Sequence, residues 1–286
     1  MWDIPRSQTY KNKELAVAIH WGSVEKAKQW IRRGADVNCR DATDGTLLHV
    51  ACQRNTASVA LLLRQGADVD AWANGQQPLH SAAEREEDED FLVYMLLLYN
   101  ANPNAPREVD QATPLHIACL RGHLRVLNAI VLSRRDGDEA MMNAVNKDGQ
   151  TPLFLACWHG HKSVVEYLLS HSNVNINIRS KDGLTIVHAA CRSGLLLELT
   201  QIPRMQQFLE ETANATDSQG RTPLHMACLY QGLPTVKYLV EHAKANVHPL
   251  TNDGQSVLDL ACQKAENHDV IYYFVRECAF WNKFNN

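Results

Sequence analysis

The chain has 286 residues, of which 45% are hydrophobic and 21% charged, and its formal net charge is -4. This composition is typical of a folded globular protein and excludes an intrinsically disordered chain. The slight negative charge argues against nucleic acid as the main partner, because phosphate binding usually requires a basic surface.

Neither a membrane span nor a secretory signal is expected. The longest apolar run, FLVYMLLLY at 91–99, is shorter than the roughly 18 residues that cross a bilayer. The first residues, MWDIPRSQTYKNKELAV, lack the continuous apolar core of a signal peptide. The eight cysteines are spread along the chain, which favours free thiols over a disulfide framework. We therefore expect an intracellular protein, in the cytoplasm first and in the nucleus as the alternative.

In chain order, the first expected element is a helix pair over 13–38, KELAVAIHWGSVEKAKQWIRRGADVN. Seven segments with one shared motif follow. They read DGTLLHVAC (44–52), GQQPLHSAA (75–83), QATPLHIAC (111–119), DGQTPLFLAC (148–157), DGLTIVHAAC (182–191), QGRTPLHMAC (219–228) and DGQSVLDLAC (253–262). Most are followed by a leucine-rich stretch and an end similar to Gly-Ala-Asp-Val-Asn, so the chain is an array of repeats.

The repeat that starts with TPLHIACLRGH (113–123) shows the expected local structure. Its proline falls in the first turn of a helix, where the missing N–H costs nothing. Leu115, Ala118 and Cys119 form an apolar face, and Gly122 ends the helix in a left-handed conformation. A second helix follows, and Asp-Gly pairs predict the turns between repeats. Such a helix pair is too small to bury its own apolar face, so stability comes from stacking on its neighbours.

Three repeats depart from this pattern. AEREEDEDF (83–91) replaces the usual short connection between the two helices, and SRRDGDEAMMN (133–143) is an insertion after a second helix. Pro203 falls within an expected second helix, and we expect the helix to break there because an interior proline costs roughly 3 kcal/mol.

The repeat period and the Thr-Pro-Leu-His motif resemble those of the ankyrin repeat family, over about residues 11–280. The resemblance implies an all-α ankyrin-repeat solenoid of seven to eight stacked helix-turn-helix units with short β-hairpin-like turns. It would be a single domain over 1–286, with an N-terminal capping unit at about 11–40, repeats at about 41–252 and a C-terminal capping unit at about 253–286.

The recurring His and Cys suggest two kinds of chemistry, and both are disfavoured. His116, Cys119 and His123 have zinc-like spacing, but Gly122 interrupts their helix, and the histidine position is Phe154 and Asp259 in other repeats. Cysteines at a repeated core position would be buried, with raised thiol pKa values, which opposes nucleophilic catalysis. The family's Thr-Pro-Leu-His histidines bind nearby backbone, and the same is expected here. We expect no metal site, no catalytic residue, no cofactor and no enzymatic activity, and we interpret Cys52, Cys119, Cys157, Cys191, Cys228 and Cys262 as small buried hydrophobes.

The resemblance implies a protein-binding function, through a concave face formed by the inter-repeat turns and the first helices. The family's variable contact positions follow the Ala-Cys pair and flank the turn glycine. In this chain they are Trp21, Gln53, Arg54, Trp72, Asn74, Gln76, Glu84, Arg85, Leu120, Arg121, Lys147, Asp148, Trp158, His159, Lys181, Asp182, Arg192, Leu229 and Tyr230.

The rings of Trp21, Trp72, Trp158 and Tyr230 are the strongest candidates, because Trp, Tyr and Arg dominate interface hot spots. Their positions are expected to be exposed. Alternatively, these rings only cover neighbouring turns.

Two functional hypotheses remain open. In the first, the chain is an interaction scaffold that binds another protein or a peptide segment. In the second, it is a regulatory or substrate-recruiting module of a larger kinase, ubiquitin-ligase adaptor or ion channel. The acidic residues Glu86–Asp90 would dock a basic partner segment, unless they form only a solvated turn. The aromatic residues near the C-terminus, Tyr272, Tyr273, Phe274, Phe280, Trp281 and Phe284, would pack on a further domain or another chain, unless the tail folds back as a cap.

Overall fold

The structure is a computed structural model that describes residues 7–85, 90–133, 138–264 and 267–278. Within these ranges the chain is helical, with three isolated β-bridges and no β-strand. The all-α class is confirmed, and bridges such as that between Arg40 and Thr46 form the expected hairpin-like turns. The chain divides into unit 1, Met1–Lys147, and unit 2, Asp148–Asn286.

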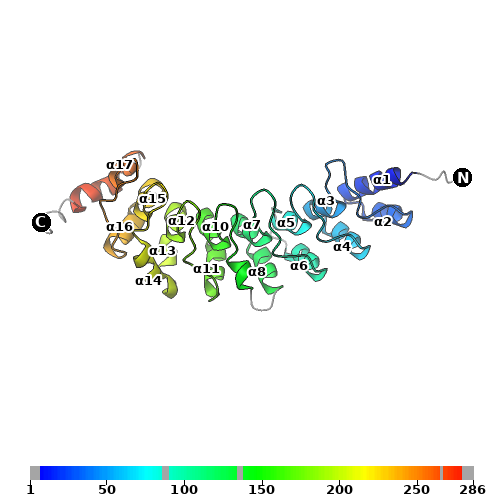
Figure 1. Cartoon of the computed structure of the whole chain (residues 1–286), viewed down its shortest axis with the longest axis horizontal. Helices are drawn as coiled ribbons and strands as arrows, with labels where there is room; N and C mark the ends of the chain where they lie inside the picture. The colour runs from blue at the N-terminus through cyan, green and yellow to red at the C-terminus, as the bar shows by residue number, and fades with distance from the viewer. Residues whose placement is uncertain (1–6, 86–89, 134–137, 265–266, 279–286) are drawn as a thin grey trace. The chain divides into compact units, whose positions relative to one another are not determined.

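Unit 1 contains four helix pairs in its described residues, arranged in two layers (Figure 1). The first helices are α1 (Gln8–His20), α3 (Leu47–Arg54), α5 (Pro78–Ala83) and α7 (Pro114–Arg121), and each contacts the next. The second helices are α2 (Val24–Arg32), α4 (Thr56–Arg64), α6 (Asp90–Leu98) and α8 (Leu124–Leu132), which also contact one another in order. The insertion after α8 adds a short helix, α9 (Glu139–Met142).

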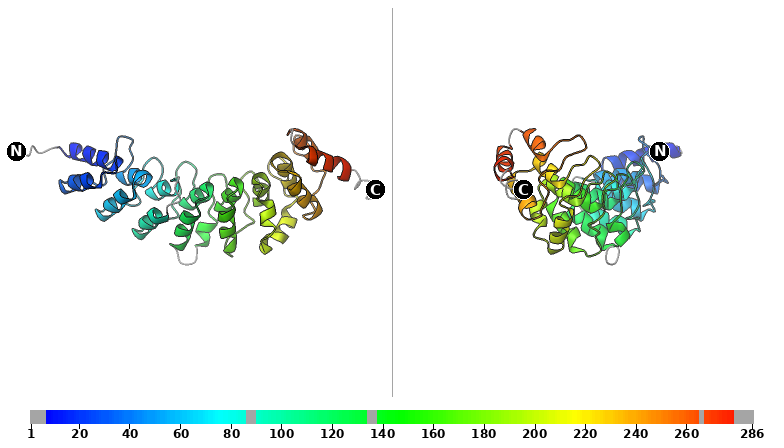
Figure 2. Two further views of the ribbon diagram at one scale, coloured as in Figure 1. Left: turned by 180° about the vertical axis from the view of Figure 1, so that it is seen from behind. Right: turned by 60° about the vertical axis from the view of Figure 1, so that its left-hand side comes forward.

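Unit 2 repeats this architecture with four more pairs in its described part, and its turns project beyond the first helices (Figure 2). The first helices are α10 (Pro152–His159), α12 (Ile186–Ser193), α15 (Pro223–Tyr230) and α17 (Val257–Cys262). The second helices are α11 (Lys162–Ser170), α13 (Leu196–Leu199) with α14 (Pro203–Thr212), α16 (Leu233–Glu241) and α18 (His268–Tyr273), which continues into the π-helical turn η1 (Phe274–Cys278). The eight pairs agree with the expected seven to eight units.

The helix ends follow the local rules read from the sequence. Thr113 caps α7 by accepting the His116 N–H, Pro114 occupies the first turn, and Gly122 ends the helix at φ 76°. The expected break at Pro203 is confirmed, because the proline begins α14 and separates it from α13.

The small residues of the repeated Ala-Cys pairs lie where successive first helices pack. Cys52, Cys119, Cys157, Cys191 and Cys228 are each 0% exposed. Cys262 was expected to be buried with them, and this prediction is wrong, because the residue is exposed. It is the last residue of α17, and within the described residues no further first helix packs on α17 to cover it.

A buried carboxylate organises one turn of unit 2. The side chain of Asp217 is 0% exposed. Its Oδ1 accepts the backbone N–H groups of Gln219 at 2.9 Å and Arg221 at 2.8 Å, and its Oδ2 accepts the Arg221 Nε–H at 2.7 Å. The carboxylate therefore holds both the turn backbone and a guanidinium.

Successive turns of unit 2 are joined by backbone hydrogen bonds. The Lys181 N–H donates to the Asp148 carbonyl at 2.8 Å, and the Asn252 N–H donates to the Gln219 carbonyl at 2.9 Å. This close approach requires glycine at position 220, which has φ +75°, because a Cβ there would lie 2.9 Å from the Asn252 nitrogen.

Replacing Gly220 with alanine is expected to lower the free energy of unfolding by about 2–3 kcal/mol. Left-handed strain contributes about 1–2 kcal/mol, and displacement of the next turn weakens a hydrogen bond worth about 1 kcal/mol. Gly254→Ala is the matched control, because Gly254 has the same φ of +75° and a Cβ added there would meet no atom within 4 Å. Urea unfolding followed by circular dichroism measures both variants, and equal losses would contradict the role of the turn-to-turn contact.

Candidate protein-binding surface

The residues expected to bind a partner lie at the ends of first helices and in the turns, and none of them is buried. Each unit has its own set of these residues, and we call the two sets the recognition face of unit 1 and of unit 2. The exposed members are Trp21, Gln53, Arg54, Trp72, Asn74, Arg121, Lys147, Asp148, His159, Lys181, Asp182 and Tyr230. The half-buried members are Gln76, Glu84, Arg85, Leu120, Trp158, Arg192 and Leu229.

Three of these residues form a cluster across successive first helices of unit 2. The Arg192 guanidinium carbon, from α12, lies 4.3 Å from the ring centroid of Trp158 on α10 and 5.4 Å from that of Tyr230 on α15. Both distances are within the range of cation–π attraction. The structure therefore brings Trp158, Arg192 and Tyr230 together, and we call them the stacked cluster.

Trp158 was expected to be exposed, but the indole is half-buried. Its ring stacks on Phe154, one helical turn earlier, with centroids 5.6 Å apart and an interplanar angle of 20°. Phe154 itself is 1% exposed and occupies the position that is histidine in most repeats. The half-buried indole thus rests on a core residue and also supports Arg192.

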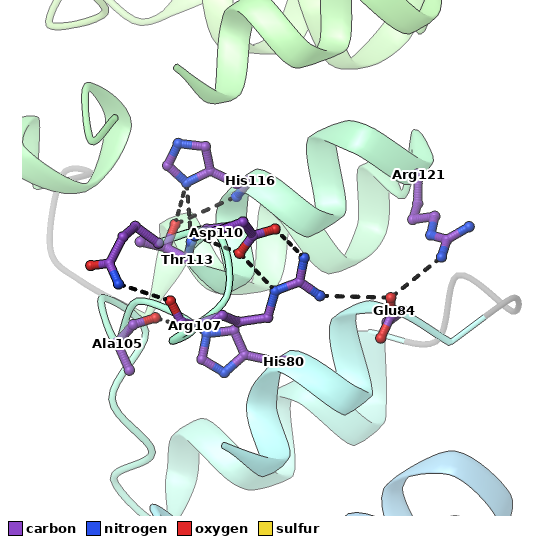
Figure 3. A network of polar contacts seen from close by, with 10 residues as sticks. His80, Glu84, Ala105, Arg107, Asp110, Thr113, His116 and Arg121 are labelled. Carbon is purple, nitrogen blue, oxygen red and sulfur yellow. Dashed lines mark hydrogen bonds and ion pairs between the residues drawn. The ribbon is translucent and has the colours of Figure 1, made fainter. Parts of the chain in front are cut away.

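A charged cluster lies on the recognition face of unit 1 (Figure 3). Glu84, at the end of α5, lies 3.4 Å from the Arg121 guanidinium and 3.7 Å from that of Arg107. Arg107 Nε–H also donates to Asp110 Oδ1 at 3.1 Å, within the turn that precedes α7. Burial opposes ionisation of Asp110, but the hydrogen bonds from Arg107 and the Ala112 N–H outweigh it and lower the pKa of this carboxyl group.

The two indoles of the recognition face in unit 1, Trp21 and Trp72, are less supported. Trp72 is 39% exposed, and its carbonyl accepts a hydrogen bond from Arg40 at 2.8 Å. Trp21 is 74% exposed and makes an edge contact with His20, at 5.4 Å between centroids. These two rings do not meet Arg121 or Glu84 in a cluster of the kind found in unit 2.

The repeated histidines bind backbone, as expected. The His80 ring Nε2 lies 2.8 Å from the Ala105 carbonyl, and that of His188 lies 3.1 Å from the Arg221 carbonyl. Burial lowers the pKa of His80, and it lowers that of His188 to about 4. Both rings are therefore neutral at neutral pH and act as scaffold.

The repeated thiols are the opposite of activated nucleophiles. Burial raises the pKa of Cys157 to about 12 and also raises that of Cys52 and Cys191. No group of three or more His, Cys, Asp or Glu side chains is arranged to hold a metal ion in the part of the chain that the structure describes.

Sequence reasoning missed Arg40, Arg107, Asp110 and Phe154. Asp110 could have been predicted from the sequence. The segment VDQATPLH aligns with KDGQTPLF, which places Asp110 at the position of Asp148. Gln111 then occupies the glycine position and has φ 58°. The support from Phe154 could also have been predicted, because an aromatic residue four positions before Trp158 lies on the same face of the helix. Arg107 and Arg40 gave no signal, because their partners depend on how the turns pack.

Two expected features fall on residues that the structure does not describe. The acidic residues Glu86, Glu87, Asp88 and Glu89 lie outside the described ranges, whereas Asp90 begins α6 and lies 2.9 Å from Arg125. Phe280, Trp281 and Phe284 also lie outside them. None of the described helices is long and apolar enough to span a bilayer.

Comparison with known proteins matches one family model along most of the chain. The family model for ankyrin repeats (3 copies) matches residues 15–107, 85–180, 115–202 and 188–284. Rabankyrin-5 is 26% identical over 251 residues in Mus musculus, covering 80% of this chain and 17% of that protein, and 26% identical over 337 residues in Homo sapiens, covering 90% and 28%. An ankyrin repeat protein of Acanthamoeba polyphaga mimivirus is 23% identical over 268 residues, covering 88% and 31%. The chain thus spans less than a third of the length of each of these relatives.

Proposed function

Because the chain belongs to the ankyrin repeat family, whose repeats are generally protein–protein interaction modules, we propose that it is an interaction scaffold that binds a partner protein or peptide through its recognition face. One observation carries the proposal. The repeated positions of the first helices α3, α5, α7, α10, α12 and α15 are buried, whereas the residues directly after them include exposed and half-buried Trp, Tyr and Arg side chains. These three residue types contribute most to binding energy in protein interfaces.

The mechanism is recognition by a preformed surface. Within each unit, the backbone of the face is fixed by helix packing and by hydrogen bonds between turns, so that few groups become ordered on binding. No cofactor is required for this function, and no reaction is proposed. The buried free thiols support a location inside the cell, where cysteines remain reduced.

The test uses binders selected from a displayed library of proteome-derived protein segments. Trp158→Ala is expected to weaken the selected complexes by more than about 1 kcal/mol, because it removes an indole and releases Arg192. Titration calorimetry measures the affinity, and circular dichroism checks that the fold is intact. Tyr94→Ala is the control, because Tyr94 is 50% exposed but lies on the second helix α6.

Two outcomes would count against the proposal. If Trp72→Ala, Trp158→Ala and Tyr230→Ala all bind with wild-type affinity, the recognition face does not make the contact. If only Tyr94→Ala weakens binding, the partner uses the layer of second helices instead.

The second candidate function is a module of a larger protein, and it is favoured by the greater length of the relatives. In this case the recognition face would recruit a substrate or regulate an attached kinase, adaptor or channel domain. A further domain would pack near α18, where Tyr272 is 61% exposed beside a hollow of about 1000 Å³. Sequencing the full transcript and measuring the mass of the native protein would separate the two candidates.

A further inference from the structure

The stacked cluster of unit 2 holds a cation in a fixed place on the recognition face. Besides its two ring contacts, Arg192 donates a hydrogen bond from Nη1 to the Trp158 carbonyl at 3.2 Å. Three successive first helices therefore position one guanidinium. Because Trp158 in turn rests on Phe154, which is 1% exposed, the support reaches the core.

The backbone beneath Arg192 is held as well. Its carbonyl accepts a hydrogen bond from Gln231 Nε2 at 2.8 Å, directly after the end of α15. Gly194, at the end of α12, leaves room for this amide, because a Cβ there would lie 2.8 Å from Gln231 Oε1. The guanidinium is preorganised, so that a ligand would lose little side-chain entropy by binding it.

Arg192 is held without a counter-ion in the described part of unit 2. No described carboxylate lies within 4.0 Å of its guanidinium. Arg221 differs, because it pairs with the buried Asp217, and Arg204 differs, because it donates to three backbone carbonyls. A guanidinium carries five N–H donors, and one of those on Arg192 is used by Trp158. Because Arg192 is only half-buried, its other donors are open to an acceptor from outside the chain.

We propose that the stacked cluster binds the carboxylate of an Asp or Glu side chain in an exposed acidic segment of the partner protein. This inference rests on the proposed function and names the chemistry of its ligand. The planar fork of Arg192 fits a carboxylate with two parallel hydrogen bonds. The rings of Trp158 and Tyr230 on either side accept the apolar part of that side chain or of its neighbours.

A carboxylate suits this cluster better than a phosphate. The doubly charged phosphate of a modified side chain is usually bound by several arginines. The stacked cluster supplies one permanent positive charge, between two uncharged rings. Its charge therefore complements a single carboxylate.

The test probes a phage-displayed library of random 12-residue peptides with wild type, Arg192→Gln and Arg192→Glu, each as the full chain. Peptides selected by wild type are expected to be enriched in Asp and Glu over the input library. Their synthetic versions should bind Arg192→Gln at least tenfold more weakly, and replacing the acidic residue of the peptide should remove this difference. The charge-reversed Arg192→Glu should select Lys and Arg instead.

Two further variants separate the role of the cluster from general effects. Arg192→Lys keeps the charge but loses the planar fork, and we expect an intermediate loss of affinity. Arg276→Gln is the matched control, because Arg276 also lies over a tyrosine ring, at 5.6 Å from Tyr272, but on η1. It should bind the selected peptides as wild type does, and thermal unfolding checks that each variant is folded.

The outcomes distinguish this inference from the proposed function. If the selected peptides lose affinity with Tyr230→Ala but show no enrichment of Asp or Glu, the face binds peptides and the carboxylate assignment is wrong. Phosphate-dependent binding of the same peptides, tested with phosphoserine in place of the acidic residue, would also overturn it. If no peptide depends on Trp158, Arg192 or Tyr230, both the inference and the proposed use of this face fail.

Discussion

Replacing Asp217 with alanine is expected to lower the free energy of unfolding of unit 2 by about 3–5 kcal/mol, which is typical when one partner of a buried ion pair is removed. The carboxylate is fully buried, and Arg221 Nη2 lies 2.7 Å from it. Without it, two turn N–H groups and a partly buried guanidinium lose their acceptor. The effect extends to the neighbouring repeat, because the Arg221 carbonyl accepts the hydrogen bond of His188.

Urea unfolding followed by circular dichroism measures this loss, and the chain itself offers the control. The place of Asp217 is taken by Ser180 and Thr251 in the adjacent turns, where a hydroxyl accepts the corresponding backbone N–H at 3.1 Å. Asp217→Thr should therefore retain part of the turn and cost clearly less than Asp217→Ala. If the two variants lose the same stability, the hydrogen bonds to the turn backbone contribute nothing, and the ion pair explains the whole effect.

The fold was predictable because the rules that set it are local and recur. A Thr-Pro pair such as Thr113 and Pro114 starts a helix and a glycine such as Gly122 ends it in any repeat. Because the motif occurs seven times, one atypical repeat does not change the predicted fold. Cys262 was mispredicted for the complementary reason. Cys262 lies in the same motif as the buried cysteines, but its burial depends on whether another helix packs over it. The motif contains no information about that neighbour.

Lowering the pH from 7 to 4 is expected to reduce the free energy of unfolding by about 3 kcal/mol through His188 alone. Burial lowers the pKa of this imidazole from 6.5 to about 4 in the folded chain. Between these values the unfolded chain binds more protons than the folded one, so that stability falls as the pH drops through this window and levels off below it. Burial also lowers the pKa of His49, His80 and His225, so their effects have the same sign.

The hydrogen bonds of these rings explain why protonation is costly. The Thr185 N–H donates to His188 Nδ1 at 3.2 Å, and this nitrogen must therefore carry a lone pair. The opposite nitrogen, Nε2, donates to the Arg221 carbonyl. Adding a proton to Nδ1 breaks the capping interaction at the start of α12, in addition to placing a charge in a buried site.

Urea unfolding at a series of pH values checks this expectation. His188→Gln should be less stable at pH 7 but should show a smaller dependence on pH between 4 and 6.5. Lys181→Gln, an exposed substitution in the preceding turn, should leave the pH dependence unchanged. A free energy of unfolding that stays constant from pH 7 to 4.5 would show that the buried imidazoles accept protons without cost.

The candidate site was predictable only as a set of positions. The repeat places Trp158, Arg192 and Tyr230 at the ends of α10, α12 and α15, and all three were identified as contact residues. Their assembly into one cluster depends on side-chain directions between repeats, which the spacing does not contain. The departure from histidine to Phe154 was seen as a loss of the motif, whereas in the structure it supports the indole.

The buried cysteines give each of five repeats its own reporter of motion. Cys52 and Cys119 in unit 1, and Cys157, Cys191 and Cys228 in unit 2, are inaccessible in the folded chain. A thiol reagent can modify each of them only when its own helix pair opens. Their rates of labelling, compared with that of the exposed Cys262, would give the order in which the repeats open without any engineered probe.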